Sequence, residues 1–281
     1  YYQSKGCEDS GSISRFEYNY PEEKYPRLYS SKNSPFKKIC TQHNLHLLDA
    51  DIRHLGTDVG QIIYKQLITS IESNVEILAN RTVYEIKPLD NYYRLGIKFH
   101  PDGEGHTYYK AKNVVIAAGR SGSKWVKQVS SDLGIQTKAN RVDIGVRFEC
   151  PDEIWNHITK ELYESKIVYK TKTYEDEVRT FCMNPSGFVV NENTNGLITV
   201  NGHAFEDKNK KSNNTNFALL VSQEFEDPFN DPNEYAYEIS KLANKLSNGS
   251  VIVQKYGDIK KGRRSTTKRI QEGFVKPTLK E

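Results

Sequence analysis

The stretch NVVIAAGRSGSKW, residues 113–125, decides how the rest of the chain is interpreted. Its apolar, β-branched run over residues 114–118 is typical of a strand in the middle of a parallel sheet that is covered on both faces. Small residues follow, and a helical spacing of apolar residues starts at Trp125. Small side chains let a bound group approach the backbone, and the free amides at a helix start can donate to anionic oxygens. The stretch therefore predicts a nucleotide-proximal turn, the alternative being a tight turn that only ends a strand.

Composition sets few limits on the function. The chain has 281 residues, enough for one large domain or two of ordinary size. Its net charge of +4, from 40 basic and 36 acidic residues, gives no strong attraction to nucleic acid or to a membrane surface. The sequence has no run of about 18 apolar residues, so we expect no membrane span. We expect a folded cytoplasmic protein, and the first residues look like a cut made inside a longer chain.

Several chemistries are disfavoured by their missing motifs. The four cysteines are far apart, without a C-x-x-C pair, which argues against a zinc site or a redox dithiol. The histidines show no metal-ligand spacing, so we expect no metal. No Gly-x-Ser-x-Gly elbow occurs, and this disfavours a serine hydrolase.

Periodicity divides the chain into four segments. Residues 1–33 have no clear period and predict an irregular arm. Residues 34–140 contain a predicted helix over residues 57–71, strand patterns after residue 75, and a hairpin with Asp102 and Gly103 at its tip. Residues 141–270 are rich in strand patterns and turns such as Asn195-Gly196, with one helix over residues 233–247. Residues 271–281 would return toward the first domain, and the predicted boundary lies near residue 140.

Several short segments of the sequence resemble segments of a family of uncharacterised FAD-dependent dehydrogenases. They include LGTDVGQIIYKQL, VEILANRTVYEI, NVVIAAGRSGSKW, RTFCMNPSGFVVNENTNGLITVNGHAF and YGDIKKGRRST. The resemblance as a whole runs from about Gly56 to about Leu279. The resemblance implies an α/β fold, in which residues 34–140 are the later part of a Rossmann-type FAD-binding domain. It also implies a largely antiparallel, α+β second domain over residues 141–270 that covers the flavin and binds substrate.

The resemblance also implies which residues approach FAD. Val83 matches a position whose backbone faces the adenine, and the turn passing close to the nucleotide comprises Ala118, Gly119, Arg120, Ser121 and Gly122. The Gly-x-Gly-x-x-Gly turn that grips the dinucleotide pyrophosphate in such enzymes does not occur in residues 1–281. We therefore expect this chain alone not to hold FAD.

Two residues are candidates for chemistry, each with a structural alternative. Cys182, in FCMNPSG, is either a reactive thiol above a flavin or a buried structural cysteine. His203, in VNGHAF, is either a proton donor or acceptor or a structural histidine.

The predicted function is part of an FAD-dependent oxidoreductase, or dehydrogenase, acting on an unknown small molecule. The alternative is a non-catalytic module that binds a ligand or partner. A weaker alternative is nucleic-acid binding through the basic run over residues 255–269, which is more simply explained as a solvated loop. The sequence leaves the oligomeric state open.

Overall fold

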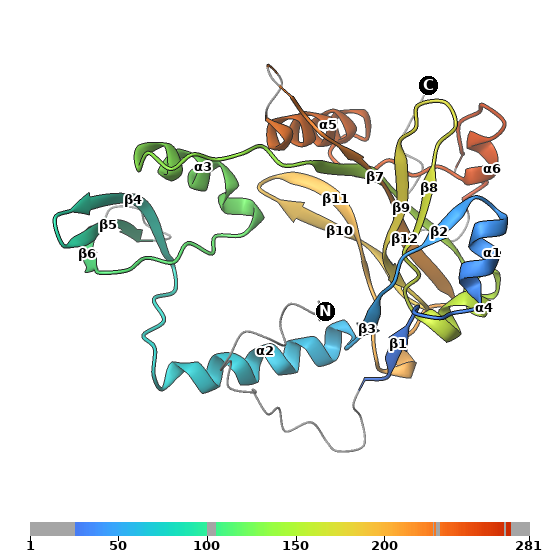
Figure 1. Ribbon diagram of the computed structural model, residues 1–281, viewed down its shortest axis with the longest axis horizontal. Coiled ribbons are helices and arrows are strands. Elements are labelled where there is room, and N and C mark those ends of the chain that lie inside the picture. Colours follow the sequence, from blue (N-terminus) through green and yellow to red (C-terminus); the bar gives the residue numbers. More distant parts are fainter. Residues whose placement is uncertain (1–25, 100–104, 227, 229–230, 267, 271–281) are drawn as a thin grey trace. The chain divides into compact units, whose positions relative to one another are not determined.

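The computed structural model describes residues 26–99, 105–226, 228, 231–266 and 268–270. Contacts within the chain divide it into two compact units. Unit 1 comprises residues 1–66 and 140–281, and unit 2 comprises residues 67–139. Figure 1 shows the elements of both units, which are taken here one at a time.

Unit 1 is built on a five-stranded antiparallel sheet (Figure 1). The strand order is β2–β8–β9–β12–β7, and β12, an interior strand, pairs with β9 on one edge and with β7 on the other. The bounds are β2 (Leu45–Leu47), β7 (Val142–Pro151), β8 (Ile167–Lys170), β9 (Glu177–Asn184) and β12 (Asn214–Gln223). These elements confirm the strand patterns predicted after residue 141.

Two smaller strand pairs complete the β-structure of unit 1. Strand β1 (Leu28–Ser30) pairs with β3 (Asp51–Arg53), and β10 (Phe188–Thr194) pairs with β11 (Leu197–His203). The turn between β10 and β11 has positive φ at both Asn195 (53°) and Gly196 (86°), the conformation for which the Asn-Gly pair is selected in tight hairpins. This confirms the predicted turn.

Helices pack beside these strands. Their bounds are α1 (Phe36–Gln42), α4 (Asp152–Leu162), α5 (Pro232–Leu246) and α6 (Tyr256–Ile259). A small core joins α1, β2 and α4 through the buried side chains of Cys40, Leu47 and Leu162. Helix α5 confirms the predicted helix, whereas α4 was missed because the region was assigned to strands. Pro151 precedes α4 and two acidic residues occupy its first turn, where they interact favourably with the helix dipole.

Unit 2 contains a three-stranded antiparallel sheet. Its strands are β4 (Arg81–Leu89), β5 (Tyr92–Phe99) and β6 (His106–Ala111), and the order is β4–β5–β6. The β5–β6 pairing confirms the predicted hairpin, whose tip at Asp102 and Gly103 lies outside the described residues. The short 3₁₀ helix η2 (Arg120–Gly122) leads into α3 (Ser123–Asp132), and Trp125 Nε1 donates to Tyr84 O on β4 at 3.4 Å.

Helix α2 (Thr57–Glu72) confirms the predicted helix and continues from unit 1 into unit 2. None of its side chains is buried, although its sequence carries an apolar stripe. Of this stripe, Ile63 and Leu67 are half-buried, and Ile62 and Ile71 are exposed.

The parallel strand expected over residues 114–118 is a wrong prediction. These residues form no strand, and Val115 is 90 % exposed. A strand that is apolar on both sides needs neighbouring strands and covering layers, and no strand in the described part of unit 2 pairs with this segment. Every strand pair among the described residues is antiparallel. The structure is therefore a mixed fold of helices and antiparallel sheets, and a Rossmann-type domain stays a prediction.

The basic run is ordered around a single carboxylate. Asp258, on α6, is 2 % exposed and accepts hydrogen bonds from Arg263 Nε (2.6 Å), Ser265 Oγ (2.8 Å) and Arg269 Nε (2.9 Å). These donors, Arg263 foremost, lower the pKa of Asp258 to about 2. Two guanidinium groups of the run are thus fixed by an internal ion pair and are not simply solvated.

We expect Asp258→Asn to lower the melting temperature by roughly 5 °C, because two guanidinium groups lose their anionic partner. The pKa of Asp258 is depressed in the folded protein. Its contribution is therefore fully present above its unfolded pKa near 3.8 and is lost as the pH falls through about 2.

Thermal unfolding followed by circular dichroism at pH 7 measures this effect. The control is Glu175→Gln, because Glu175 pairs with Lys170 through a side chain that is 76 % exposed and should contribute little. Equal melting temperatures for the two variants would show that Asp258 does not organise the loop.

Candidate functional site

Cys182 lies in an irregular part of β9. Its φ of 48° is left-handed, which is uncommon for a residue other than glycine, asparagine or aspartate. The pairing of β9 with β12 changes register between Asn216 and Ala218, opposite this position. Such a bulge leaves backbone groups without their ladder partners and re-aims the side chain.

Side chains form hydrogen bonds with the backbone N–H and C=O groups of Cys182. Its N–H donates to Glu164 Oε1 at 2.9 Å, and its carbonyl accepts from Asn184 Nδ2 at 2.8 Å and from Arg147 Nη1 at 3.1 Å. The thiol Sγ lies 3.8 Å from Asn184 Nδ2 and 4.0 Å from Asn201 Oδ1. The unusual backbone at Cys182 is therefore held by three hydrogen bonds, all of them to side chains.

A buried polar network supports this arrangement. Asn216 is fully buried, and its Oδ1 accepts from Arg147 Nη1 at 2.6 Å and from Asn184 Nδ2 at 3.4 Å. Gly202, on β11, lies against all three groups, because a Cβ there would be only 2.3–2.5 Å from Asn184 Nδ2, Asn216 Oδ1 and Arg147 Nη1. Glycine at position 202 thus lets β11 approach the network beneath Cys182.

His203 follows on the same strand and is held by the start of α2. Its Nδ1 lies 2.9 Å from Thr57 Oγ1. On the same strand, Asn201 Oδ1 lies 4.0 Å from the thiol of Cys182. Both candidates proposed from the sequence therefore lie in unit 1, Cys182 on β9 and His203 on β11.

The loop after His203 is fastened to the same helix start. Thr57 N donates to Ala204 O at 2.9 Å, and the Asp58 carboxylate accepts from the N–H groups of Glu206 (3.0 Å) and Asp207 (3.1 Å). Desolvation raises the pKa of Asp58, but these backbone donors outweigh it and lower the pKa overall. No pattern in the sequence predicts the contact between Thr57 and His203.

A second histidine lies close by, half-buried and in its neutral form. His54 stacks on Tyr163 with ring centroids 4.5 Å apart. Burial, with a further contribution from the positive charge of Lys211, lowers the pKa of His54 to about 4. Burial also raises the pKa of Tyr163. The His54 Nε2 atom is buried and has no hydrogen-bond partner among the residues that the structure describes.

Lys166 adds a cation near the thiol. Burial is the main reason that its pKa is lowered, and the nearby carboxylate of Glu164 and the Cys182 thiol oppose the shift. The cluster of unit 1 therefore combines a thiol, two imidazoles, a phenol, an amine and carboxylates. Sequence reasoning missed His54, Tyr163, Glu164 and Lys166, because no local motif marks them.

The predicted nucleotide turn lies in unit 2 and is open. Residues 118–121 are exposed. Gly119 has φ of 62° and ψ of −164°, and no atom lies within 4 Å of the position that its Cβ would occupy. Gly122 caps α3 without a side-chain hydrogen bond, and a Cβ there would lie 2.4 Å from Ala118 Cβ. The turn thus has open space beside Gly119 and no side-chain cap at the start of α3.

Val83 belongs to the same unit as this turn. It is half-buried on β4, where it pairs with Ile97, and α3 contacts this strand through Trp125. The structure therefore places the turn at the start of the helix that packs on the strand of Val83. Whether Val83 and the turn contact a nucleotide stays a prediction.

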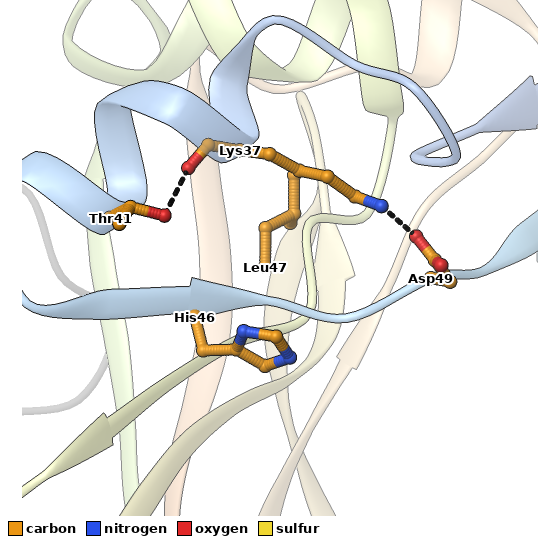
Figure 2. Close-up of a pocket in the computed structure, with 5 residues that line it drawn as sticks. All are labelled: Lys37, Thr41, His46, Leu47 and Asp49. Atoms are coloured by element: carbon orange, nitrogen blue, oxygen red, sulfur yellow. Dashed lines mark hydrogen bonds and ion pairs between the residues drawn. The ribbon is translucent and has the colours of Figure 1, made fainter.

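A surface pocket lies elsewhere in unit 1 (Figure 2). Its volume is about 160 Å³, and it lies between α1 and β2, where Lys37 forms an ion pair with Asp49 and Thr41 Oγ1 donates to Lys37 O at 2.9 Å. Ligand sites occupy about 300 Å³ or more, so a dinucleotide does not fit there. No predicted site residue lines this pocket.

The described part of the chain shows neither a metal-binding group of side chains nor a membrane-spanning helix. Within residues 26–99, 105–226, 228, 231–266 and 268–270, no group of three or more His, Cys, Asp or Glu side chains is placed to hold a metal ion. None of the helices in these ranges has the length and apolar character needed to cross a bilayer.

We expect the free energy of unfolding to fall as the pH is lowered from about 6.5 to about 4. The pKa of His54 is depressed when folded, so the unfolded chain binds the extra proton in this window, at a cost of about 3 kcal/mol at most. Urea unfolding at pH 7.0, 5.5 and 4.5 measures the slope.

His54→Gln should flatten that slope, whereas His46→Gln, which changes an exposed strand residue, should leave it unchanged. The same slope in wild type and His54→Gln would contradict the assignment.

Gly202→Ala should destabilise the protein by roughly 1–3 kcal/mol, because the added methyl displaces the Asn184–Asn216–Arg147 network. The matched control is Gly60→Ala on α2, where no atom lies within 4 Å of the added Cβ. That change should be neutral or stabilising by up to about 1 kcal/mol, since alanine favours a helix. Urea midpoints compare the two, and a neutral Gly202→Ala would show that the network is loosely packed.

Comparison with known proteins identifies the family. A family model described as FAD-dependent protein, C-terminal domain-like, matches residues 141–281, which is half of the chain. An uncharacterised protein of Clostridium beijerinckii is 26 % identical over 230 residues, covering 76 % of this chain and 42 % of its own length. The chain thus spans less than half of the curated relative that it matches. The chain belongs to the family of FAD-dependent proteins that carry this C-terminal domain.

Proposed function

We propose that this chain is part of an FAD-dependent oxidoreductase that passes a hydride to or from a small-molecule substrate. The observation that carries the proposal is the family match over residues 141–281, which associates unit 1 with FAD-dependent proteins. The flavin would supply the redox chemistry, and the protein would bind, orient and tune it.

The turn in unit 2 supports a role in holding the nucleotide part of FAD. Gly119 has open space where a side chain would stand, and the uncapped start of α3 offers backbone N–H groups to phosphate or ribose oxygens. Ala118, Ser121 and Gly122 keep the approach free of bulky side chains. This geometry fits the edge of a nucleotide and offers no complete pyrophosphate site.

The cluster in unit 1 supports a role toward substrate. With Thr57 Oγ1 on its Nδ1, the imidazole of His203 is oriented so that Nε2 is left to donate or accept a proton. Cys182 adds a thiol on a backbone that three hydrogen bonds from side chains hold in place. The substrate would meet a proton-transfer group and a thiol on neighbouring strands.

We expect residues 1–281 alone to stay colourless after incubation with FAD and gel filtration, because they contain no Gly-x-Gly-x-x-Gly turn. The complete product of the gene should retain flavin, with absorption bands near the visible flavin wavelengths. A complete product that retains no flavin would contradict the proposal and would favour a non-catalytic binding module.

The turn itself is tested by Gly119→Ala in the complete product. A methyl at this position enters the space through which the nucleotide would approach, and we expect FAD affinity to fall by roughly 10-fold or more. Gly134→Ala is the matched control, because Gly134 also has a positive φ (67°) with no atom within 4 Å of its Cβ position. Equal affinities of the two variants, measured by flavin fluorescence quenching, would show that the turn does not contact FAD.

A further inference from the structure

One face of the three-stranded sheet of unit 2 carries cations and aromatic rings. Residues directly opposite each other on neighbouring strands share a face, so the pairings define it. Lys87 on β4 is opposite Arg94 on β5, and Arg94 is opposite Lys110 on β6. Because side chains alternate along a strand, the same face also carries Tyr92, Lys98, His106 and Tyr108. We call it the cationic face.

The row of three cations is unfavourable for the sheet by itself. Like charges directly opposite each other destabilise an antiparallel pair. Glu85 relieves part of this repulsion, because its carboxylate lies 2.7 Å from Lys87 Nζ and 3.2 Å from Arg94 Nη2. None of the ion pairs between residues that the structure describes involves Lys98 or Lys110. Four cations against one carboxylate leave a net charge of +3 on the cationic face.

Tyrosine rings hold three of these cations in place. The pairs, with the distance from the cationic carbon or nitrogen to the ring centroid, are Arg94 with Tyr108 (4.9 Å), Lys110 with Tyr92 (4.9 Å) and Lys98 with Tyr84 (5.2 Å). A ring attracts a cation through its quadrupole and carries no formal charge that would cancel it. The cations are therefore held on the face and keep their charge for an anionic ligand.

Aromatic rings lie between the cations of this face. A Cβ at Gly96 would lie 2.7 Å from Tyr84 Cζ, so the ring of Tyr84 lies close against the sheet there. Its hydroxyl donates to that of Tyr108 at 3.4 Å, and His106 packs edge-on against Tyr84 with ring centroids 5.5 Å apart. Tyr108 is opposite Gly96 and is 57 % exposed. The cationic face thus offers an exposed ring at its centre.

We propose that the cationic face binds a single-stranded nucleic acid, with phosphates on the cations and a base against the ring of Tyr108. Proteins that bind single strands combine cations that follow the backbone with aromatic side chains on which bases stack, often on the face of a sheet. An acidic polypeptide could use the cations, but the exposed ring between them favours a ligand whose anionic groups alternate with flat rings. The proposal goes beyond the proposed function and does not require flavin.

Fluorescence anisotropy of a labelled oligothymidylate of about 12 nucleotides, added to the 281-residue chain without flavin, tests the proposal. A net charge of +3 would neutralise about three phosphates, so log affinity should fall with log salt concentration at a slope of about −2. The affinity should therefore fall roughly 20-fold between about 50 and 200 mM salt. No binding at the lower salt concentration would overturn the proposal.

Charge reversal on the cationic face should separate binding from stability. Lys110→Glu should weaken binding by roughly 10-fold or more, because one phosphate contact is replaced by repulsion. The same change should raise the melting temperature by about 1–3 °C, since position 110 no longer places a like charge opposite Arg94. Lys98→Glu provides a second measure of binding, and affinity that survives both changes would contradict the proposal.

The matched control for charge reversal is Lys260→Glu in unit 1. Its Nζ also lies over a tyrosine ring, 6.0 Å from the centroid of Tyr256, and the change in net charge is the same. Lys260 belongs to the basic run over residues 255–269, and we expect this variant to bind the oligonucleotide as the wild type does. Equal losses for Lys260→Glu and Lys110→Glu would show attraction by net charge alone and would overturn the proposal.

Tyr108→Ala tests the contact with a base. We expect affinity to fall roughly 5-fold or more with an unchanged salt slope, because stacking is lost and no phosphate contact is removed. Poly-glutamate at equal charge concentration should compete weakly. Unchanged affinity of Tyr108→Ala, or poly-glutamate that competes as well as unlabelled oligonucleotide, would overturn the proposal and assign the face to acidic polypeptides. Because flavin is omitted throughout, such a failure is separate from a failure to bind FAD.

Discussion

The pairing of β12 with both of its neighbours is the constraint on which unit 1 depends. Ten consecutive residues of β12 are in register with β7, from Asn214 opposite Pro151 to Gln223 opposite Val142. On the other edge, the register with β9 shifts between Asn216 and Ala218. The regular pairing of β12 with β7 holds the sheet together. The register shift between β12 and β9 creates the irregular segment in which Cys182 adopts its left-handed backbone. One strand therefore determines both the frame and the position of the thiol.

Local patterns could predict much of this architecture. The strands of residues 141–223, the Asn195-Gly196 turn and helix α5 each follow from alternation, turn chemistry or capping within a short window. Helix α4 was missed because its start signals, Pro151 and Asp152, stand inside a region dominated by strand patterns. The strand expected over residues 114–118 failed for a different reason: its pattern is right for a buried strand, but pairing depends on a partner that no local pattern can reveal.

The candidate site shows the same limit. Cys182 and His203 could be proposed from their residue types, but the residues that contact each of them come from distant segments. Thr57 and His203 are 146 residues apart in sequence, and Arg147 and Asn216 are 69 apart. His54 and Tyr163 carry the largest effects of burial on pKa in the cluster, yet neither lies in a recognisable motif. Individual strands and helices of the fold could thus be predicted from the sequence. For the site, single residues could be predicted, but their arrangement could not.

The hydrogen bonds of Asp58 have a consequence for how the chain would be cut. A carboxylate near a helix start usually caps its own helix, but Asp58 binds the amides of Glu206 and Asp207, 148 and 149 residues away. A protease that cleaved after Phe205 would loosen the first turn of α2 as well as the loop. The fragments would remain joined because β12, after the cut, pairs with β7 and β9 before it, so the nick would pass unnoticed in gel filtration and be detected only after denaturation. Resistance to cleavage at this loop therefore indicates that the hydrogen bonds between the start of α2 and the loop are formed.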